Sequence, residues 1–102
     1  MSSPPRPYEI RLLPAAVRQL RSLDEEEAQR VRSELLGQAV RSASPGSRGG
    51  KSLKAIRGRH DRFFRLRIGE LRVVFDLVQE ERVLRVHGIV RRRDLDRWLR
   101  GR

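Results

Sequence analysis

Residues 64–75, FRLRIGELRVVF, constrain the fold more than any other part of the chain. Apolar and charged residues alternate on both sides of Gly69-Glu70, which is the pattern of two paired β-strands joined by a two-residue turn. In that register Arg67 lies opposite Arg72, and Arg65 shares their face. Like charges that face each other across a strand pair are destabilising. The hairpin therefore predicts a strongly basic face whose presence needs a functional explanation.

Two further alternating segments extend the predicted sheet. Residues 7–14, PYEIRLLP, predict a short first strand in which Tyr8, Ile10 and Leu12 alternate with charged residues. Residues 83–90, VLRVHGIV, predict the last strand of a meander. In the last strand, Leu84 and Val86 are expected to face the core. The expected members of its opposite face are Arg85, His87 and Ile89. The basic face of the hairpin is thus expected to continue onto this strand.

Helical periodicity fills the region between residues 14 and 41. Pro14 suits the first turn of one helix. Asp24 is a good N-cap for a second helix, and Glu27 follows three residues later, as in a capping box. The apolar residues expected on the buried side of this second helix are Ala28, Val31, Leu35, Leu36, Ala39 and Val40. Together these features predict a helical hairpin.

The C-terminal residues predict one more helix, with Asp94 as its cap. The apolar stripe of this helix consists of Leu95, Trp98 and Leu99. The predicted order is βααβββα, so the fold class is α+β: an N-terminal strand and helical hairpin packed on an antiparallel β-sheet, with a short C-terminal helix. Residues 1–102 are expected to form a single domain, in which residues 1–6 are disordered and residues 42–52 form a loop rich in Ser and Gly.

The chain is strongly basic. Its 24 Lys and Arg residues outnumber its 13 Asp and Glu residues, which gives a net charge of +11 at pH 7, and every basic residue except Lys51 and Lys54 is an arginine. Arginine has a planar fork that suits bidentate phosphate contacts. The positive excess is larger in residues 57–102 than in the residues before them. These features favour an anionic partner, either nucleic acid or an acidic protein.

Several classes of protein do not fit this composition. The absence of cysteine excludes disulfides and thiolate metal sites, and two histidines are too few for a typical structural zinc site. We therefore expect no metal and no cofactor. The N-terminal sequence MSSPPRPYEI lacks the apolar region of a secretory signal, and no apolar run reaches membrane-spanning length. We expect a soluble, cytoplasmic protein without membrane contact.

The predicted basic face is the candidate for chemistry. It collects Arg65, Arg67 and Arg72, and three consecutive arginines, residues 91–93, follow at the end of the last predicted strand. For any single arginine, a solvated surface charge is the simpler interpretation. A concave group of arginines, however, can bind a phosphate and stabilise the charge that develops on it. None of them can act as a general base, because arginine is effectively never deprotonated in proteins.

Short motifs follow one another along the C-terminal half: Leu53-Lys54, Gly58, Arg65-Leu66-Arg67-Ile68-Gly69, Arg72-Val73-Val74-Phe75, and Ile89 followed by Arg92 and Asp94. Each motif alone is weakly specific. Their order and spacing resemble the RelE/ParE toxin superfamily, and its RelE-like members in particular. The predicted helical hairpin fits the same fold, so the resemblance covers nearly the whole chain.

The resemblance implies a bacterial toxin that a co-encoded antitoxin neutralises. RelE-like toxins are metal-independent endoribonucleases (mRNA interferases) that cut mRNA in the ribosomal A site. The ribose 2′-OH attacks the adjacent phosphate, which leaves a 2′,3′-cyclic phosphate and a 5′-OH. The implied partners are an antitoxin, mRNA and the ribosome, with operator DNA bound only through the toxin–antitoxin complex.

The resemblance also implies roles for individual arginines. Arg72 matches the arginine that stabilises the transition-state phosphate, and Arg92 matches the arginine that ends the last strand. Arg67 is expected beside them at the scissile phosphate. Arg91 takes the place of a histidine that many relatives have. The residues expected to contact RNA are Lys54, Arg65, Arg85, Arg91 and Arg93.

The group that transfers the proton stays open at this point. The C-terminal tyrosine of many relatives has no counterpart, and its position falls on Asp96 or Trp98. Asp96 could act as a base or could simply favour the dipole of the last helix. Trp98 could stack on a base or anchor the core. His87 could accept a proton among the arginines, or it could be an ordinary strand histidine.

Two other functions also stay open. A ParE-like toxin would inhibit DNA gyrase by binding and would cut no RNA, and the missing tyrosine favours this alternative. A degenerate toxin would act only by binding its antitoxin or operator DNA. The retained set of arginines favours the endoribonuclease.

Overall fold

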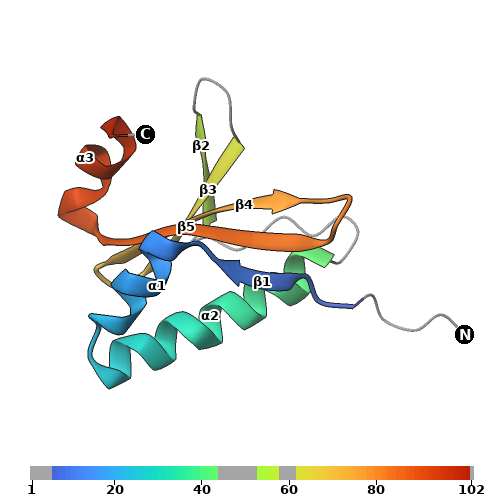
Figure 1. Cartoon of the computed structure of the whole chain (residues 1–102), viewed down its shortest axis with the longest axis horizontal. Coiled ribbons are helices and arrows are strands. Elements are labelled where there is room, and N and C mark those ends of the chain that lie inside the picture. The colour runs from blue at the N-terminus through green and yellow to red at the C-terminus, as the bar shows by residue number, and fades with distance from the viewer. Residues whose placement is uncertain (1–5, 44–52, 58–61, 102) are drawn as a thin grey trace, which may run out of the picture.

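The structure is a computed structural model that describes the backbone of residues 6–43, 53–57 and 62–101 and the side chains of residues 6–43 and 63–101. Its elements, drawn in Figure 1, are β1 (Glu9–Leu12), α1 (Pro14–Arg21), α2 (Glu25–Ala43), β2 (Leu53–Arg57), β3 (Arg62–Ile68), β4 (Leu71–Val78), β5 (Val83–Arg91), a 3₁₀ helix (Arg92–Asp94) and α3 (Leu95–Arg100). None of the helices in these described parts is long and apolar enough to cross a membrane.

The strands form one five-stranded sheet in the order β1-β5-β4-β3-β2. The α+β class is confirmed, and the structure adds β2, a short strand that the alternation pattern did not single out. The meander is antiparallel as expected, but β1 runs parallel to β5. A parallel pair needs a long connection, and here α1, α2 and strands β2 to β4 lie between β1 and β5 along the chain.

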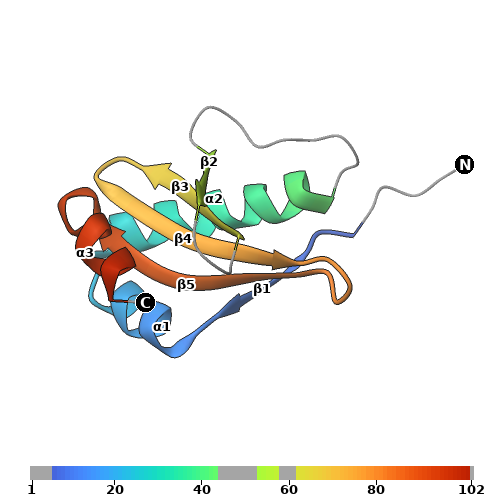
Figure 2. The same cartoon turned by 90° about the horizontal axis from the view of Figure 1, so that it is seen from above.

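One face of the sheet lies against α1 and α2, and α3 lies on the other side (Figure 1, Figure 2). The buried core between the sheet and the two helices consists of Tyr8, Ala16, Val31, Leu35, Ala39, Ala43, Leu66, Ile68, Leu71, Val73, Phe75, Leu84, Val86 and Ile89. Burying each larger side chain stabilises the fold by about 1.5–3 kcal/mol. The core therefore fixes which face of each strand points away from the helices.

The β3–β4 hairpin has the predicted register. Arg67 lies opposite Arg72, and the turn at Gly69-Glu70 is as short as the pattern indicated. Gly69 has φ = +59°, a left-handed backbone conformation that residues with a side chain rarely adopt. This conformation explains why the turn contains a glycine. Residues of β3, β4 and β5 that point away from α1 and α2 form what we call the distal face, which includes Phe63, Arg65, Arg67, Arg72, Val74, Asp76, Arg85, His87, Gly88 and Val90.

An irregularity in β5 changes one predicted face. Val74 lies opposite Gly88, but the next residue, Phe75, lies opposite Val86, so one residue of β5 is extra. This β-bulge reverses the alternation beyond His87. Ile89 consequently faces the core and is 3% exposed. The prediction that Ile89 shares the face of Arg85 and His87 was wrong for this reason.

The second helix begins as expected but differs on its apolar side. The backbone N–H of Glu27 donates to Asp24 Oδ1 at 2.8 Å, which confirms the cap. Leu36 and Val40 were expected in the core and are instead 62% and 52% exposed. Each follows a buried residue by one position, which turns it about 100° around the helix. The helix also continues through Ala43, so the first two residues of the predicted loop, 42–52, are helical, and the rest of that loop lies outside the described residues.

The last helix packs on the distal face rather than in the main core. A Cβ built on Gly88 would lie 2.7 Å from ring atoms of Trp98, so the indole rests directly on this glycine. Trp98 is half-buried and is not among the residues of the main core, so it anchors α3 on the sheet. Its stacking on a base stays a prediction. Asp94 does not cap the helix with its side chain. It already has helical backbone angles after the 3₁₀ turn, and it accepts a hydrogen bond from Arg97.

Candidate functional site

The β3–β4 turn holds one arginine in a fixed position. Arg72 Nη1 donates to the carbonyl oxygens of Gly69 and Leu71, both at 2.9 Å. The residue is only 7% exposed. The sequence placed Arg72 on an exposed surface, and this was wrong because the guanidinium folds back onto the turn. These neutral carbonyls accept from Nη1 without cancelling the positive charge of the guanidinium.

Three more arginines surround Arg72. Burial lowers its pKa from the ordinary value, and the positive charges of Arg65, Arg67 and Arg92 lower it further, while Glu70 acts in the opposite direction. Arginine nevertheless stays protonated under all ordinary conditions. Within residues 6–43 and 63–101, no salt bridge joins any of these four arginines to a carboxylate. We call Arg65, Arg67, Arg72 and Arg92 the arginine cluster.

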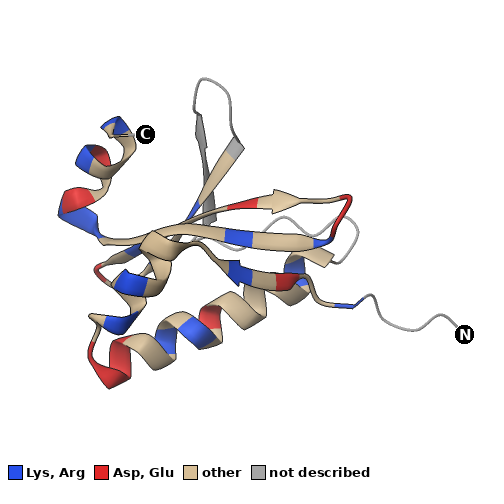
Figure 3. Ribbon diagram, viewed as in Figure 1, with Lys and Arg blue, Asp and Glu red and all other residues tan. Residues whose placement is uncertain are grey.

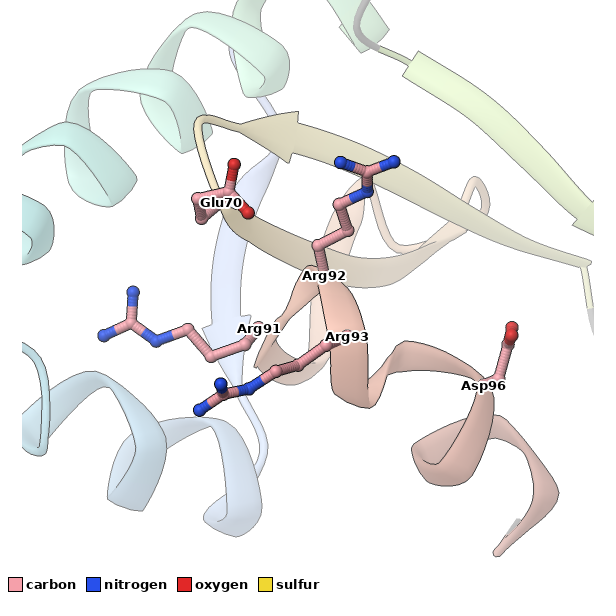
Figure 4. Close-up of a pocket in the computed structure, with 5 residues that line it drawn as sticks. All are labelled: Glu70, Arg91, Arg92, Arg93 and Asp96. Carbon is pink, nitrogen blue, oxygen red and sulfur yellow. The ribbon is translucent and has the colours of Figure 1, made fainter.

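A backbone contact brings Arg92 to the same turn. The N–H of Arg92 donates to the carbonyl oxygen of Glu70 at 2.7 Å, which joins the end of β5 to the hairpin. An open hollow of about 590 Å³ lies here, lined by Glu70, Arg91, Arg92, Arg93 and Asp96. Figure 4 shows that the Arg92 side chain points away from those of Arg91 and Arg93. Arg93 and Asp96 are both exposed.

The other end of the distal face has a different arrangement. Arg85 donates from Nε to Asp76 Oδ1 at 2.9 Å and also binds Oδ2 through Nη2. His87 Nε2 lies 3.1 Å from Asp76 Oδ1, and the Phe63 ring meets the imidazole edge-on at 4.9 Å between centroids. Burial raises the pKa of the Asp76 carboxyl, but the hydrogen bonds from Arg85 and the adjacent imidazole of His87 lower it by more, so the pKa lies below its ordinary value.

His87 therefore has a carboxylate neighbour, whereas the sequence predicted arginine neighbours. His87 is the extra residue of the bulge, three positions along β5 from Val90, which lies opposite Arg72. Its role in proton transfer stays a prediction. Arg85, which was expected to contact RNA, forms a salt bridge with Asp76.

Arg91 also forms a salt bridge, in this case with Glu27. Its Nη1 and Nη2 donate to Glu27 Oε2 and Oε1 at 2.5 and 3.0 Å. Figure 3 shows the acidic start of α2 to which Glu27 belongs. The hydrogen bond from Arg91 lowers the pKa of Glu27, and the same bond raises the pKa of Arg91. The Lys54 side chain lies outside the described residues, although the Lys54 backbone pairs with Arg65.

Sequence reasoning found the arginine cluster but missed its organisation. Neither Asp76 nor the contact of Glu27 with Arg91 was anticipated. The signal for Asp76 was present, because a lone acid two positions after Val74 falls on the basic face. Glu27 gave no such signal, since it is 64 residues from Arg91 and already fitted a capping box. Among the described residues, no group of three or more His, Cys, Asp or Glu could hold a metal ion.

Comparisons with known proteins identify the fold. Neither a scan against protein-family models nor a search of curated proteins gives a match. Solved structures do match: a chain of the toxin–antitoxin complex RelBE2 from Mycobacterium tuberculosis has 22% identity and a TM-score of 0.66, covering 84% of this chain and 92% of that chain.

Two more structures agree with this one. A chain of the archaeal RelE–RelB complex from Pyrococcus horikoshii has 19% identity and a TM-score of 0.64, covering 85% of this chain and 97% of that chain. The isolated RelE toxin of Escherichia coli has 20% identity and a TM-score of 0.63, covering 82% of this chain and 83% of that chain. The chain has the fold of the RelE toxins, as the motifs indicated.

Proposed function

We propose that this protein is the toxin of a toxin–antitoxin pair and that it is a metal-independent endoribonuclease that cleaves mRNA at the ribosome. The observation that carries the proposal is the arginine cluster, in which Arg65, Arg67 and Arg92 gather around the buried Arg72. No carboxylate salt bridge joins any of the four in the described parts. The fold supports it, because the similar structures are RelE toxins or their complexes with antitoxins.

The cluster suits attack by a ribose 2′-OH on the adjacent phosphate. In that step the bond from O2′ to phosphorus forms, the bond from phosphorus to O5′ breaks, the 2′-OH loses a proton and O5′ gains one. Negative charge develops on the phosphate oxygens. Arg72 is preorganised by its two carbonyl contacts, so its Nε–H and second Nη can stabilise that charge without rearrangement. Arg67 and Arg92 add positive charge from exposed positions.

A separate group must accept the proton from the 2′-OH. Asp96 lines the same hollow as Arg92, whereas His87 lies in the bulge against Asp76. We assign Asp96 as the first candidate base because of this shared hollow, with His87 as the second. Asp96→Asn should then lower the cleavage rate at neutral pH and leave RNA binding unchanged. A loss caused by His87→Gln with none from Asp96→Asn would reverse the assignment.

The decisive experiment maps the 5′ ends of mRNA on ribosomes after induction of the protein in bacteria. Cuts at fixed codon positions are expected with the wild type and are expected to disappear with Arg72→Ala. Arg85→Ala is the matched control, because it removes an arginine of the same face that is already paired with Asp76. Intact transcripts would refute the endoribonuclease.

The same induction experiment tests the alternatives. Gyrase-dependent DNA breaks with intact mRNA would identify a ParE-like toxin, for which the absence of a tyrosine in α3 is the supporting observation. Unchanged growth, RNA and DNA, with binding to antitoxin and operator retained, would identify a degenerate toxin.

An antitoxin partner is part of the proposal. The exposed Leu36 and Val40 form an apolar strip on α2, and an amphipathic antitoxin helix is the partner that fits such a strip. Co-expression of the adjoining reading frame should restore growth of cells that make the toxin. Leu36→Glu should weaken the complex, and Gln29→Glu, at an exposed position of the same helix, should not.

A further inference from the structure

Arg91 connects the end of β5 to the first turn of α2. Its guanidinium donates to both carboxylate oxygens of Glu27, and the two side chains are 43% and 26% exposed. A bidentate pair of this kind fixes direction as well as distance. The carboxylate also cancels the charge of Arg91, in contrast to the carbonyl partners of Arg72.

The pair lies next to the contacts that place the arginine cluster. Arg91 lies opposite Leu71, whose carbonyl oxygen accepts from Arg72. The next residue, Arg92, donates its backbone N–H to Glu70. Arg72 and Arg92 therefore both donate hydrogen bonds to carbonyl oxygens of residues 69–71. The pair of Arg91 with Glu27 attaches the C-terminal end of β5, directly before Arg92, to α2.

We infer that Arg91 is a positioning residue: its pair with Glu27 sets where Arg92 stands relative to Arg72, and Arg91 does not itself contact RNA. The sequence predicted an RNA contact for Arg91. A neutralised arginine adds little attraction for phosphate, whereas a displacement of a neighbouring group by about 1 Å can lower a rate on the order of 100-fold. The activity readout of this inference rests on the proposed function, but its structural readout does not.

Three variants test the pair. Glu27→Gln and Arg91→Gln each break it, and the double variant Glu27→Arg with Arg91→Glu restores it in reverse. Glu9→Gln is the matched control, since it breaks the pair of Glu9 with Arg11 on β1, an edge strand that does not touch the hollow.

The first readout needs no RNA. Hydrogen exchange of the Arg92 amide should accelerate about two- to fivefold in each single variant, the range expected for loss of a partly exposed pair. The double variant should recover most of the protection, and Glu9→Gln should not change it. Unchanged exchange in both single variants would overturn the inference, whether or not the protein cleaves RNA.

The second readout is RNA cleavage and binding. Both single variants should lower kcat by similar factors, leave KM unchanged and leave the salt dependence of RNA binding unchanged. A direct RNA contact predicts a different outcome: only Arg91→Gln would weaken binding, with a salt slope smaller by about 0.7, and Glu27→Gln would strengthen it. That result would overturn the inference. Absence of wild-type cleavage would refute the proposed function and leave the exchange experiment to decide the role of Arg91.

Discussion

The distal face of the sheet holds arginine in two different ways. At the β3–β4 turn, the side chain of Arg72 is held by neutral carbonyls and keeps a net positive charge. At the bulge in β5, the side chain of Arg85 is held by the carboxylate of Asp76, so its charge is cancelled. The two ends share strands β4 and β5, yet among the side chains of residues 63–101 only those at the turn end concentrate positive charge without a carboxylate salt bridge.

This difference shows that the partners of an arginine, more than the number of arginines, indicate where an anion binds. A net charge of +11 distributes over the whole molecule and favours anionic partners in general. The carboxylates of Asp76 and Glu27 neutralise Arg85 and Arg91, so these two arginines attract an anion less than the unpaired ones do. The turn end is also where burial of Arg72 strengthens each electrostatic contact.

The largest expected effect separates the two ends by activity. Arg72→Ala should lower kcat for RNA cleavage by about 100- to 1,000-fold, the range for removing one preorganised donor to a transition state. Arg85→Ala should leave kcat within about threefold of the wild type, because its charge already serves Asp76. Cleavage of a defined mRNA on programmed ribosomes measures both.

Because Arg72 is buried, its alanine variant needs a check on folding. Arg92→Ala, at an exposed position, should also lower kcat by at least tenfold without changing the thermal midpoint. Equal losses from Arg85→Ala and Arg72→Ala would show that the two ends of the distal face do not differ in function.

The second prediction concerns the boundary between the two ends, where Trp98 rests on Gly88. Gly88→Ala should destabilise the fold by about 1–3 kcal/mol, since the new methyl group would overlap the indole ring. Thermal unfolding and the emission of the single tryptophan measure the effect. Gly37→Ala is the matched control, because its nearest neighbour is the flexible end of Arg41 and alanine favours a helix. Equal stability of Gly88→Ala and the wild type would contradict the packing of α3.

The sequence predicted the features that depend on local pattern. Period-two alternation determined the register of the β3–β4 hairpin, and the N-cap preference located the start of α2 at Asp24. The bulge at His87 was beyond reach, because one extra residue in a strand leaves no trace in composition. The misplacement of Ile89 followed directly from it.

The candidate site was predictable in its residues but not in its partners. Arg65, Arg67 and Arg72 follow from alternation alone. The pairing of Arg91 with Glu27 depends on how α2 crosses the sheet, which is a tertiary property. The capping-box pattern already explained the presence of Glu27, so the sequence gave no reason to look for a second partner of its side chain.

The third prediction uses acid to distinguish the two ends. The folded-state pKa of Asp76 is lowered, so its stabilising contribution is fully present above the ordinary carboxyl pKa and is lost as the pH falls through the lower, folded-state value. Arg72 does not titrate in this range. Between pH 5 and 2, the unfolding free energy of the wild type should therefore fall by about 1 kcal/mol more than that of Asp76→Asn. Parallel acid profiles of the two proteins would show that the bulge end holds no such ion pair.

The smallest expected effect compares the two ends by salt dependence. If Arg67 contacts one phosphate of single-stranded RNA, Arg67→Ala should reduce the slope of log affinity against log salt by about 0.7. Arg67 is exposed, so the substitution should not disturb folding. Arg85→Gln, which keeps a hydrogen-bond donor for Asp76, should leave the slope unchanged because that arginine has no free charge to exchange for counterions. Fluorescence anisotropy of a labelled oligoribonucleotide between 50 and 200 mM salt, about the range over which such slopes are resolved, measures both. A smaller slope for Arg85→Gln would place the RNA across the bulge as well as the turn, and the arginine cluster would then be only one part of a longer binding surface.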